Sequence, residues 1–137
     1  MIRTFTPAEI TSLTTENFQL APIHDRLNIY AGPNGALLVA EVDGDLAAAA
    51  ALFLDGDTLH VEHFAVSPRF RGMGLGGNLM RRVISHARDH HAKKIIAQAP
   101  AWCPEWRSFF TRQGFTYTQR ETSTSNTDMT PVELQLA

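Results

Sequence analysis

The hydrophobic pattern divides the chain into a strand-rich first half and a second half in which helices and strands alternate. Apolar residues alternate or run together over three segments, residues 36–42, 46–54 and 58–66. Asp43-Gly44 and Asp55-Gly56 separate these segments, and Asp-Gly pairs between apolar runs are typical of tight hairpins. The pattern therefore predicts an antiparallel meander of three strands.

After the meander, apolar side chains recur at helical spacing from Leu75 onward. The expected elements are a helix from Leu75 to about His91, a strand over residues 95–99, a helix over residues 105–113 capped by Gly114, and two strands over residues 115–120 and 131–136. A polar loop over residues 121–130 joins the last two strands. This half of the chain is therefore predicted to alternate helix and strand.

The first residues carry a helix start signal. Thr6 can cap a helix, Pro7 suits the first helical position, and Glu9 completes a capping box. We expect a helix from there to about residue 20, followed by an irregular stretch over residues 21–35 that is marked by turn residues.

Composition limits the possible functions. A chain of 137 residues with 44% hydrophobic and 19% charged residues is expected to form one domain over residues 1–137. A net charge of −2 gives no general attraction to nucleic acid or to an anionic membrane. The one cysteine, Cys103, and the lack of a secretory segment in this sequence predict a cytoplasmic protein.

A glycine-dense turn between the strand ending at Val66 and the helix beginning at Leu75 carries most of the chemical information. Glycines let the backbone turn tightly and approach a ligand, and the first amides of a helix attract anions. The literal pattern G-x-G-x-x-G is present, but Ser67 to Arg71 separate it from the strand, and residues 95–99 carry no carboxylate. A dinucleotide-binding fold is therefore disfavoured, and a nucleotide P-loop is excluded because no Gly-Lys-Ser/Thr follows.

The spacing Arg71-x-x-Gly74-x-Gly76 resembles the R/Q-x-x-G-x-G/A signature of the GNAT superfamily of N-acetyltransferases. The segment from His63 to Pro68 is similar to the family's fourth strand and the turn that leaves it, and the segment from Ser108 to Phe115 is similar to its late helix ending in Gly-Phe. The resemblance implies an α/β (α+β) fold with a mixed, largely antiparallel sheet of six to seven strands. Helices would cover both faces, and the strands over residues 58–66 and 95–99 would splay apart.

The resemblance also implies acetyl-coenzyme A as the acyl donor, with no metal. Its pyrophosphate would bind the loop and its pantetheine arm would pair with the splayed strand, whose free amide could hold the oxyanion. The implied cofactor-binding residues are Phe64, Ala65, Val66, Arg71, Gly72, Met73, Gly74, Leu75, Gly76 and Gly77. Arg71 would contact phosphate or brace the loop, and phosphate contact is favoured.

The candidate catalytic residues are His60, Glu62 and Cys103. If strand alternation holds, His60 and Glu62 share a face with Phe64, while His63 lies on the other. His60 or Glu62 could accept a proton from an ammonium substrate. Where the family carries a tyrosine that protonates the departing thiolate, this chain has Phe110, which leaves solvent, Cys103 or Tyr117 as alternatives.

The expected reaction is acetyl transfer to a primary amine of a small molecule or peptide by direct attack in a ternary complex. Phe110 motivates an alternative, a non-catalytic acyl-coenzyme A sensor on the same fold. The sequence leaves open whether the protein forms a homodimer, and no nucleic acid or membrane partner is expected. His86 and His90 have the spacing of a helical metal pair, but a solvated helix face is the favoured interpretation. Trp102 and Trp106 are candidates to line the acceptor pocket, although packing is the favoured role for both.

Overall fold

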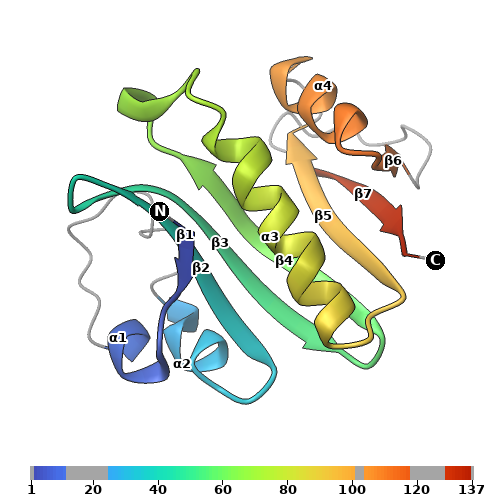
Figure 1. The fold of residues 1–137 in the computed structure, drawn as a ribbon. Coiled ribbons are helices and arrows are strands. Elements are labelled where there is room, and N and C mark those ends of the chain that lie inside the picture. The colour runs from blue at the N-terminus through green and yellow to red at the C-terminus, as the bar shows by residue number, and fades with distance from the viewer. Residues whose placement is uncertain (1, 12–24, 101–103, 118–128, 137) are drawn as a thin grey trace.

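A computed structural model describes residues 2–11, 25–100, 104–117 and 129–136. Its seven-stranded sheet has the order β1-β2-β3-β4-β5-β7-β6 (Figure 1). The strands are β1 (Ile2–Thr4), β2 (Gly35–Val42), β3 (Asp45–Asp55), β4 (Thr58–Val66), β5 (Lys94–Pro100), β6 (Thr116–Tyr117) and β7 (Met129–Gln135). The helices are α1 (Pro7–Thr11), α2 (Leu27–Tyr30), α3 (Leu75–Asp89) and α4 (Pro104–Arg112). Only β4 and β5 pair in parallel among the recorded strand pairs of the described residues.

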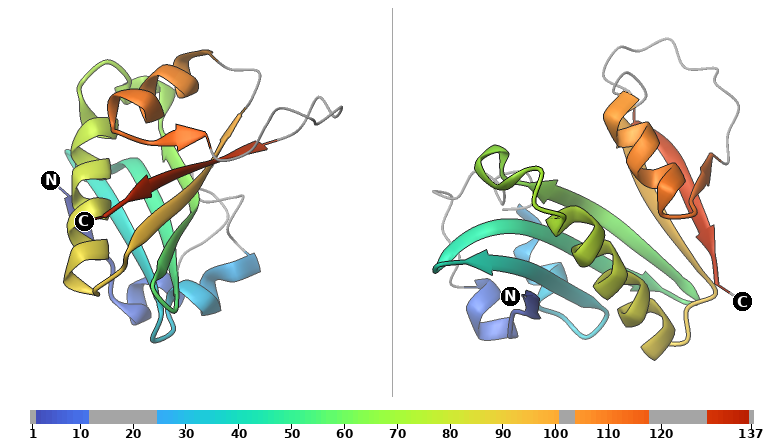
Figure 2. Two further views of the ribbon diagram at one scale, coloured as in Figure 1. Left: turned by 90° about the vertical axis from the view of Figure 1, so that its right-hand side faces the viewer. Right: turned by 45° about the horizontal axis from the view of Figure 1, so that its top comes forward.

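Helices cover both faces of the sheet (Figure 2). On one face α3 and α4 enclose the larger core, in which Met80, Val83 and Phe110 are buried. On the other face α1 and α2 cover a second core around Ile10 and Tyr30. The sheet is therefore buried on both sides, as the sequence predicted.

The alanine run of β3 explains how both layers pack closely. Residues 47–51 are all alanines with no exposed surface. Ala48 and Ala50 belong to the core beneath α3, and Ala49 and Ala51 to the core beneath α2. Because these side chains are small and alternate between the faces, helices on both sides can approach the central strand.

The predicted capping box at α1 is confirmed. The Glu9 amide donates to Thr6 Oγ1 at 3.1 Å, and the Thr6 amide donates to Glu9 Oε1 at 2.9 Å. A hydrogen bond from Arg3, helped by the Thr6 amide, lowers the pKa of Glu9 to about 2. The predicted continuation of this helix over residues 12–20 lies outside the described residues.

The structure also corrects the predicted elements. Residues 2–4 form an unpredicted edge strand, and α2 is a short helix within the stretch predicted to be irregular. The α4 helix ends as expected, with Gly114 at φ +97° and the Phe115 amide donating to the Phe110 carbonyl at 3.0 Å. No helix in the described part of the chain is long and apolar enough to span a membrane.

Candidate functional site

The glycine loop leaves β4 and opens α3 with its amides exposed. Gly72 and Gly74 adopt φ of +82° and +78°, a region that glycine enters without strain. The first helical bond of α3 runs from the Asn78 amide to the Gly74 carbonyl at 3.1 Å, and no side chain caps the helix. The amides before Asn78 therefore precede the helical ladder, where the helix dipole favours an anion.

Arg71 braces this loop against β4. Its Nε donates to the Val66 carbonyl at 3.3 Å, and the side chain is exposed. A guanidinium has five N–H donors, so this single bond leaves capacity for phosphate. The sequence offered bracing and phosphate contact as alternatives, and the geometry accommodates both. Phosphate contact stays a prediction.

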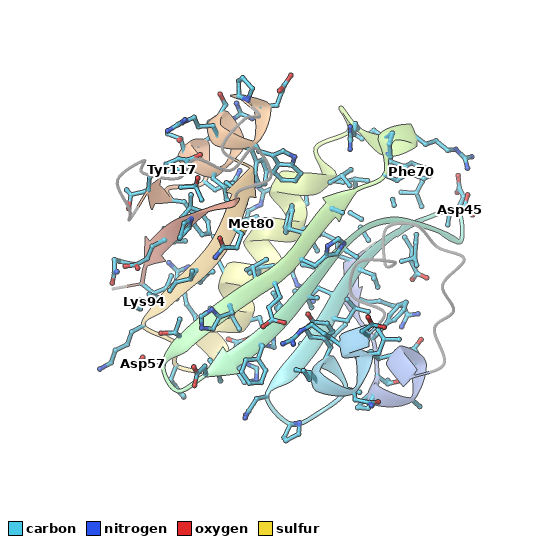
Figure 3. The ribbon with its side chains drawn as sticks, turned by 180° about the vertical axis from the view of Figure 1, so that it is seen from behind. Asp45, Asp57, Phe70, Met80, Lys94 and Tyr117 are labelled. Carbon is cyan, nitrogen blue, oxygen red and sulfur yellow. The ribbon has the colours of Figure 1, made fainter. Side chains whose placement is uncertain are left out.

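A groove of about 640 Å³ runs beside the loop, between β4 and α4. Of the residues predicted to bind the cofactor, the groove is lined by Phe64, Val66, Arg71, Gly72, Gly74, Leu75 and Gly76. Ala65, Met73 and Gly77 are not among the lining residues, and Met73 is 56% exposed. Phe70, at the turn beyond β4 (Figure 3), also lines the groove. Most of the predicted set therefore surrounds one space.

The groove continues into a gap between β4 and β5. These strands pair only from Thr58 with Lys94 to Val61 with Ala97, while β5 pairs with β7 along its whole length. Beyond Val61 the two strands diverge (Figure 2), and a cavity of about 170 Å³ opens between them. Phe64 and Trp106 line both spaces, so the groove and the cavity adjoin each other.

A β-bulge at Glu62 changes which residues face this cavity. In the pairing of β3 with β4, Leu52 lies opposite Val61 and Ala51 lies opposite His63, which leaves Glu62 as the extra residue. The predicted alternation is therefore wrong: His60 does not share a face with Phe64. Phe64 packs into the core beneath α3, and His63 follows His60 on the other face.

The Glu62 side chain points toward α2, where two residues bind its carboxylate. The Arg26 Nε donates to Oε1 at 2.9 Å and its Nη2 to Oε2 at 3.1 Å. The Tyr30 hydroxyl donates to Oε1 at 2.7 Å. Burial, followed by the hydrogen bond to Glu62, raises the pKa of Tyr30 to about 12, so the phenol stays protonated and donates at neutral pH. Two residues, Arg26 and Tyr30, thus fix the position of the Glu62 carboxylate.

The cavity lining separates the candidate bases. Its polar residues are Glu62, His63 and Gln98, and its apolar floor includes Val61 and Phe110. His60 is not among the lining residues. His63 was placed on the wrong face because a bulge has no distinct signal in the apolar pattern of this strand.

The remaining candidates fall outside the cavity or outside the described residues. Cys103 and Trp102 lie outside the described residues. Phe110 is 1% exposed and packs against other aromatic rings, so no hydroxyl stands at the position of the family's general acid. Tyr117 lies in β6 (Figure 3), and its buried hydroxyl has no hydrogen-bond partner in the described part of the chain. Its position does not place a proton donor in the cavity lining.

His86 in α3 and His90, the residue that follows the end of this helix, form a stacked pair. Their ring centroids are 4.2 Å apart, and burial, followed by the charge of His90, lowers the pKa of His86. No group of three or more His, Cys, Asp or Glu side chains suited to a metal occurs within the described ranges.

These elements, a glycine loop at the start of a helix and a splayed pair of parallel strands in a mixed sheet, are those of the acetyltransferase fold that the sequence resemblance implied. The model of the acetyltransferase (GNAT) family matches residues 4–115. The chain belongs to this family, as the sequence signature indicated.

Comparisons with individual proteins agree with the family. The chain is 36% identical over 93 residues to glucosamine 6-phosphate N-acetyltransferase 1 of Oryza sativa subsp. japonica, in a match covering 61% of this chain and 54% of the relative. The matched region thus spans about half of that relative's length. The IAA acetyltransferase of Bacillus cereus ATCC 14579 superposes with a TM-score of 0.79 at 16% identity, over 99% of both chains. A GNAT acetyltransferase from Elizabethkingia anophelis, with acetyl-CoA bound, gives a TM-score of 0.77 at 20% identity over 99% and 97%.

Proposed function

We propose that this protein is an N-acetyltransferase that moves an acetyl group from acetyl-coenzyme A to a primary amine of a small molecule or peptide. The observation that carries the proposal is that the groove beside the glycine loop adjoins the cavity between β4 and β5. Two adjoining spaces of this kind suit a phosphate-bearing donor held at the loop, with its acyl group directed toward an acceptor in the cavity.

The donor would be held mainly by backbone groups. The loop amides would bind the pyrophosphate, with Arg71 adding charge. Beyond Val61, the edge of β4 opposite β3 has no β5 partner. Its main-chain groups would therefore pair with the pantetheine amides as an added strand does. The acetyl-CoA bound to the Elizabethkingia anophelis acetyltransferase supports this choice of donor.

The reaction would proceed by direct attack in a ternary complex. The neutral amine nitrogen forms a bond to the thioester carbonyl carbon, the C–S bond breaks, and coenzyme A leaves as a thiolate. The amine loses a proton to a general base. His63 is our first candidate for this base because it lines the cavity. Glu62 would orient the acceptor, because hydrogen bonds from Arg26 and Tyr30 hold its carboxylate in a fixed position at the cavity. His60, which lies farther along the same face, is the second candidate base.

Thiol release measured with acetyl-coenzyme A and a panel of amines tests the proposal. The panel should include glucosamine 6-phosphate, because the rice relative carries that name. Titration with acetyl-coenzyme A and with NADH provides the binding control. Binding of NADH without binding of acetyl-coenzyme A would overturn the donor assignment.

Substitution of the histidines then identifies the base. His63→Ala should lower kcat about 100-fold, the lower end of the range of general-base contributions, with little change in affinity for acetyl-coenzyme A. His60→Ala is the matched variant on the same strand face. A pH–rate profile that His60→Ala alters and His63→Ala does not would reverse the assignment.

Phe110 favours a second candidate function, a non-catalytic acyl-coenzyme A sensor. A phenylalanine buried beside the cavity cannot protonate the departing thiolate. Tight binding of acetyl-coenzyme A without thiol release for any acceptor would favour the sensor.

A further inference from the structure

Arg26 occupies an unusual position for a surface cation, because it is held next to the cavity rather than free in solvent. Its guanidinium forms a fork with Glu62, a residue that lines the cavity. It also lies 6.0 Å from the centre of the Tyr30 ring. Tyr30 is 1% exposed and therefore gives the cluster a fixed base.

The fork leaves one edge of the guanidinium available. Glu62 takes the edge formed by Nε and Nη2, and Nη1 has no recorded hydrogen bond within the described ranges. The Arg26 side chain is 46% exposed to solvent, and the Glu62 side chain is 26% exposed. An exposed cation held in one orientation is a preorganised site for an anion, because little conformational freedom is lost when the anion binds.

The cavity itself sets the size of the group that enters it. Its volume of about 170 Å³ and its apolar floor suit a compact amine, and Glu62 and His63 lie at its polar wall. A second, anionic group on the same molecule would remain outside the cavity, on the side where Arg26 pairs with Glu62.

We propose that the acceptor is a compact primary amine that also carries a carboxylate or a phosphate, and that Arg26 binds this anionic group. The inference rests on the proposed acetyltransferase function and specifies its substrate class. Arg26 is then a specificity-determining residue. Its exposed edge recognises the acceptor, and its paired edge keeps Glu62 in place.

The test compares matched amines that differ in the anionic group. O-phosphoethanolamine is paired with ethanolamine, and γ-aminobutyrate with butylamine, and kcat/KM is measured by thiol release. The wild-type protein should prefer the anionic member by about 10- to 100-fold, the range of a charge-assisted hydrogen bond. Arg26→Gln should remove that preference by lowering kcat/KM mainly for the anionic member. Arg26→Lys, which keeps the charge without the fork, should retain part of it.

Arg69→Gln provides the matched control. Arg69 is an exposed arginine that pairs with Asp45 at 3.3 Å, at the turn beyond β4 and outside both lining sets. This variant should keep the wild-type preference.

Two results would overturn the inference alone: acetylation of both members of each pair at equal rates, or an equal loss for both members in Arg26→Gln. Absence of thiol release from every amine would instead refute the acetyltransferase function, and the inference would fall with it.

Discussion

The hydrogen bond from Tyr30 to Glu62 should stabilise the folded state, and the second tyrosine, Tyr117, provides a matched control for testing this. Tyr30→Phe removes one hydroxyl from a side chain that is 1% exposed and leaves the ring in place. The lost bond, 2.7 Å long, joins a neutral donor to a charged acceptor. Such bonds contribute about 1.5–3 kcal/mol to the free energy of unfolding.

Arg26 determines where in that range the loss should fall. Because Arg26 still pairs with Glu62 in the variant, the carboxylate keeps a partner, and we expect a loss of about 1.5–2 kcal/mol. An unfolding entropy of about 2.1 cal/mol/K per residue over 137 residues converts this loss into a Tm lowered by about 5–7 °C. Thermal unfolding followed by circular dichroism or calorimetry measures the shift.

Tyr117→Phe is the matched control. The Tyr117 hydroxyl is buried and has no partner in the part of the chain that the structure describes. Its removal should therefore change the free energy of unfolding by between zero and about 1 kcal/mol in the stabilising direction. Equal losses of Tm in the two variants would refute the assignment of the stabilising bond to Tyr30 and Glu62.

The pH dependence gives an independent check. The pKa of Tyr30 is raised from 10.0 to about 12, so the folded state retains the phenolic proton when the unfolded state has lost it. This contribution is fully present below about pH 10 and is lost between about pH 10 and 12. At roughly 1.4 kcal/mol per pKa unit it amounts to about 2–3 kcal/mol. The wild-type protein should lose more stability over this interval than Tyr30→Phe, and parallel curves would contradict the reasoning.

Four further substitutions test the fold, the proposed donor site and the departure of the thiolate. Gly35→Ala should lower the free energy of unfolding by about 3 kcal/mol, because the added Cβ would lie 2.2 Å from the Ile29 carbonyl oxygen; an unchanged Tm would contradict that packing. Gly74→Ala should weaken acetyl-coenzyme A binding about tenfold through backbone strain of about 1–2 kcal/mol. Gly44→Ala, at φ +84° in a hairpin, introduces the same kind of backbone strain and should lower Tm without altering the affinity for acetyl-coenzyme A. Phe110→Tyr should raise kcat about tenfold or more if thiolate departure limits turnover; an unchanged kcat would show that it does not.

The geometry of the glycine loop was predictable because it is determined by local sequence. The glycines of the loop are required by positive φ, as at Gly72 and Gly74, and they adjoin a helix whose apolar period is clear. Glycine spacing therefore reported the backbone geometry directly. The capping box at Thr6 and Glu9 was predictable for the same reason, since each partner lies within one turn of the other.

The surroundings of Glu62 were predicted poorly because they depend on contacts between distant segments. Glu62 and Arg26 are 36 positions apart, and nothing in either neighbourhood marks the pair. The α2 helix has four residues and no side-chain cap, so it shows neither a helical period nor a start signal. The bulge depends on the register between β3 and β4, and a single inserted residue reverses the faces of all later side chains.

The splay of β4 from β5 and the contact of Glu62 with α2 would let one strand contribute to both proposed substrate sites. One edge of β4 stays paired with β3 through Val66, which keeps the strand rigid, while its other edge is released from β5 after Val61. The released edge runs beside the groove, and Glu62 on the same strand is bound by α2. The proposed donor site therefore depends on β4, the glycine loop and α4, whereas the proposed acceptor site depends on β4 and α2. Changes in residues 25–30 should consequently alter the choice of amine without altering the choice of donor, since α2 contributes no residue to the donor groove.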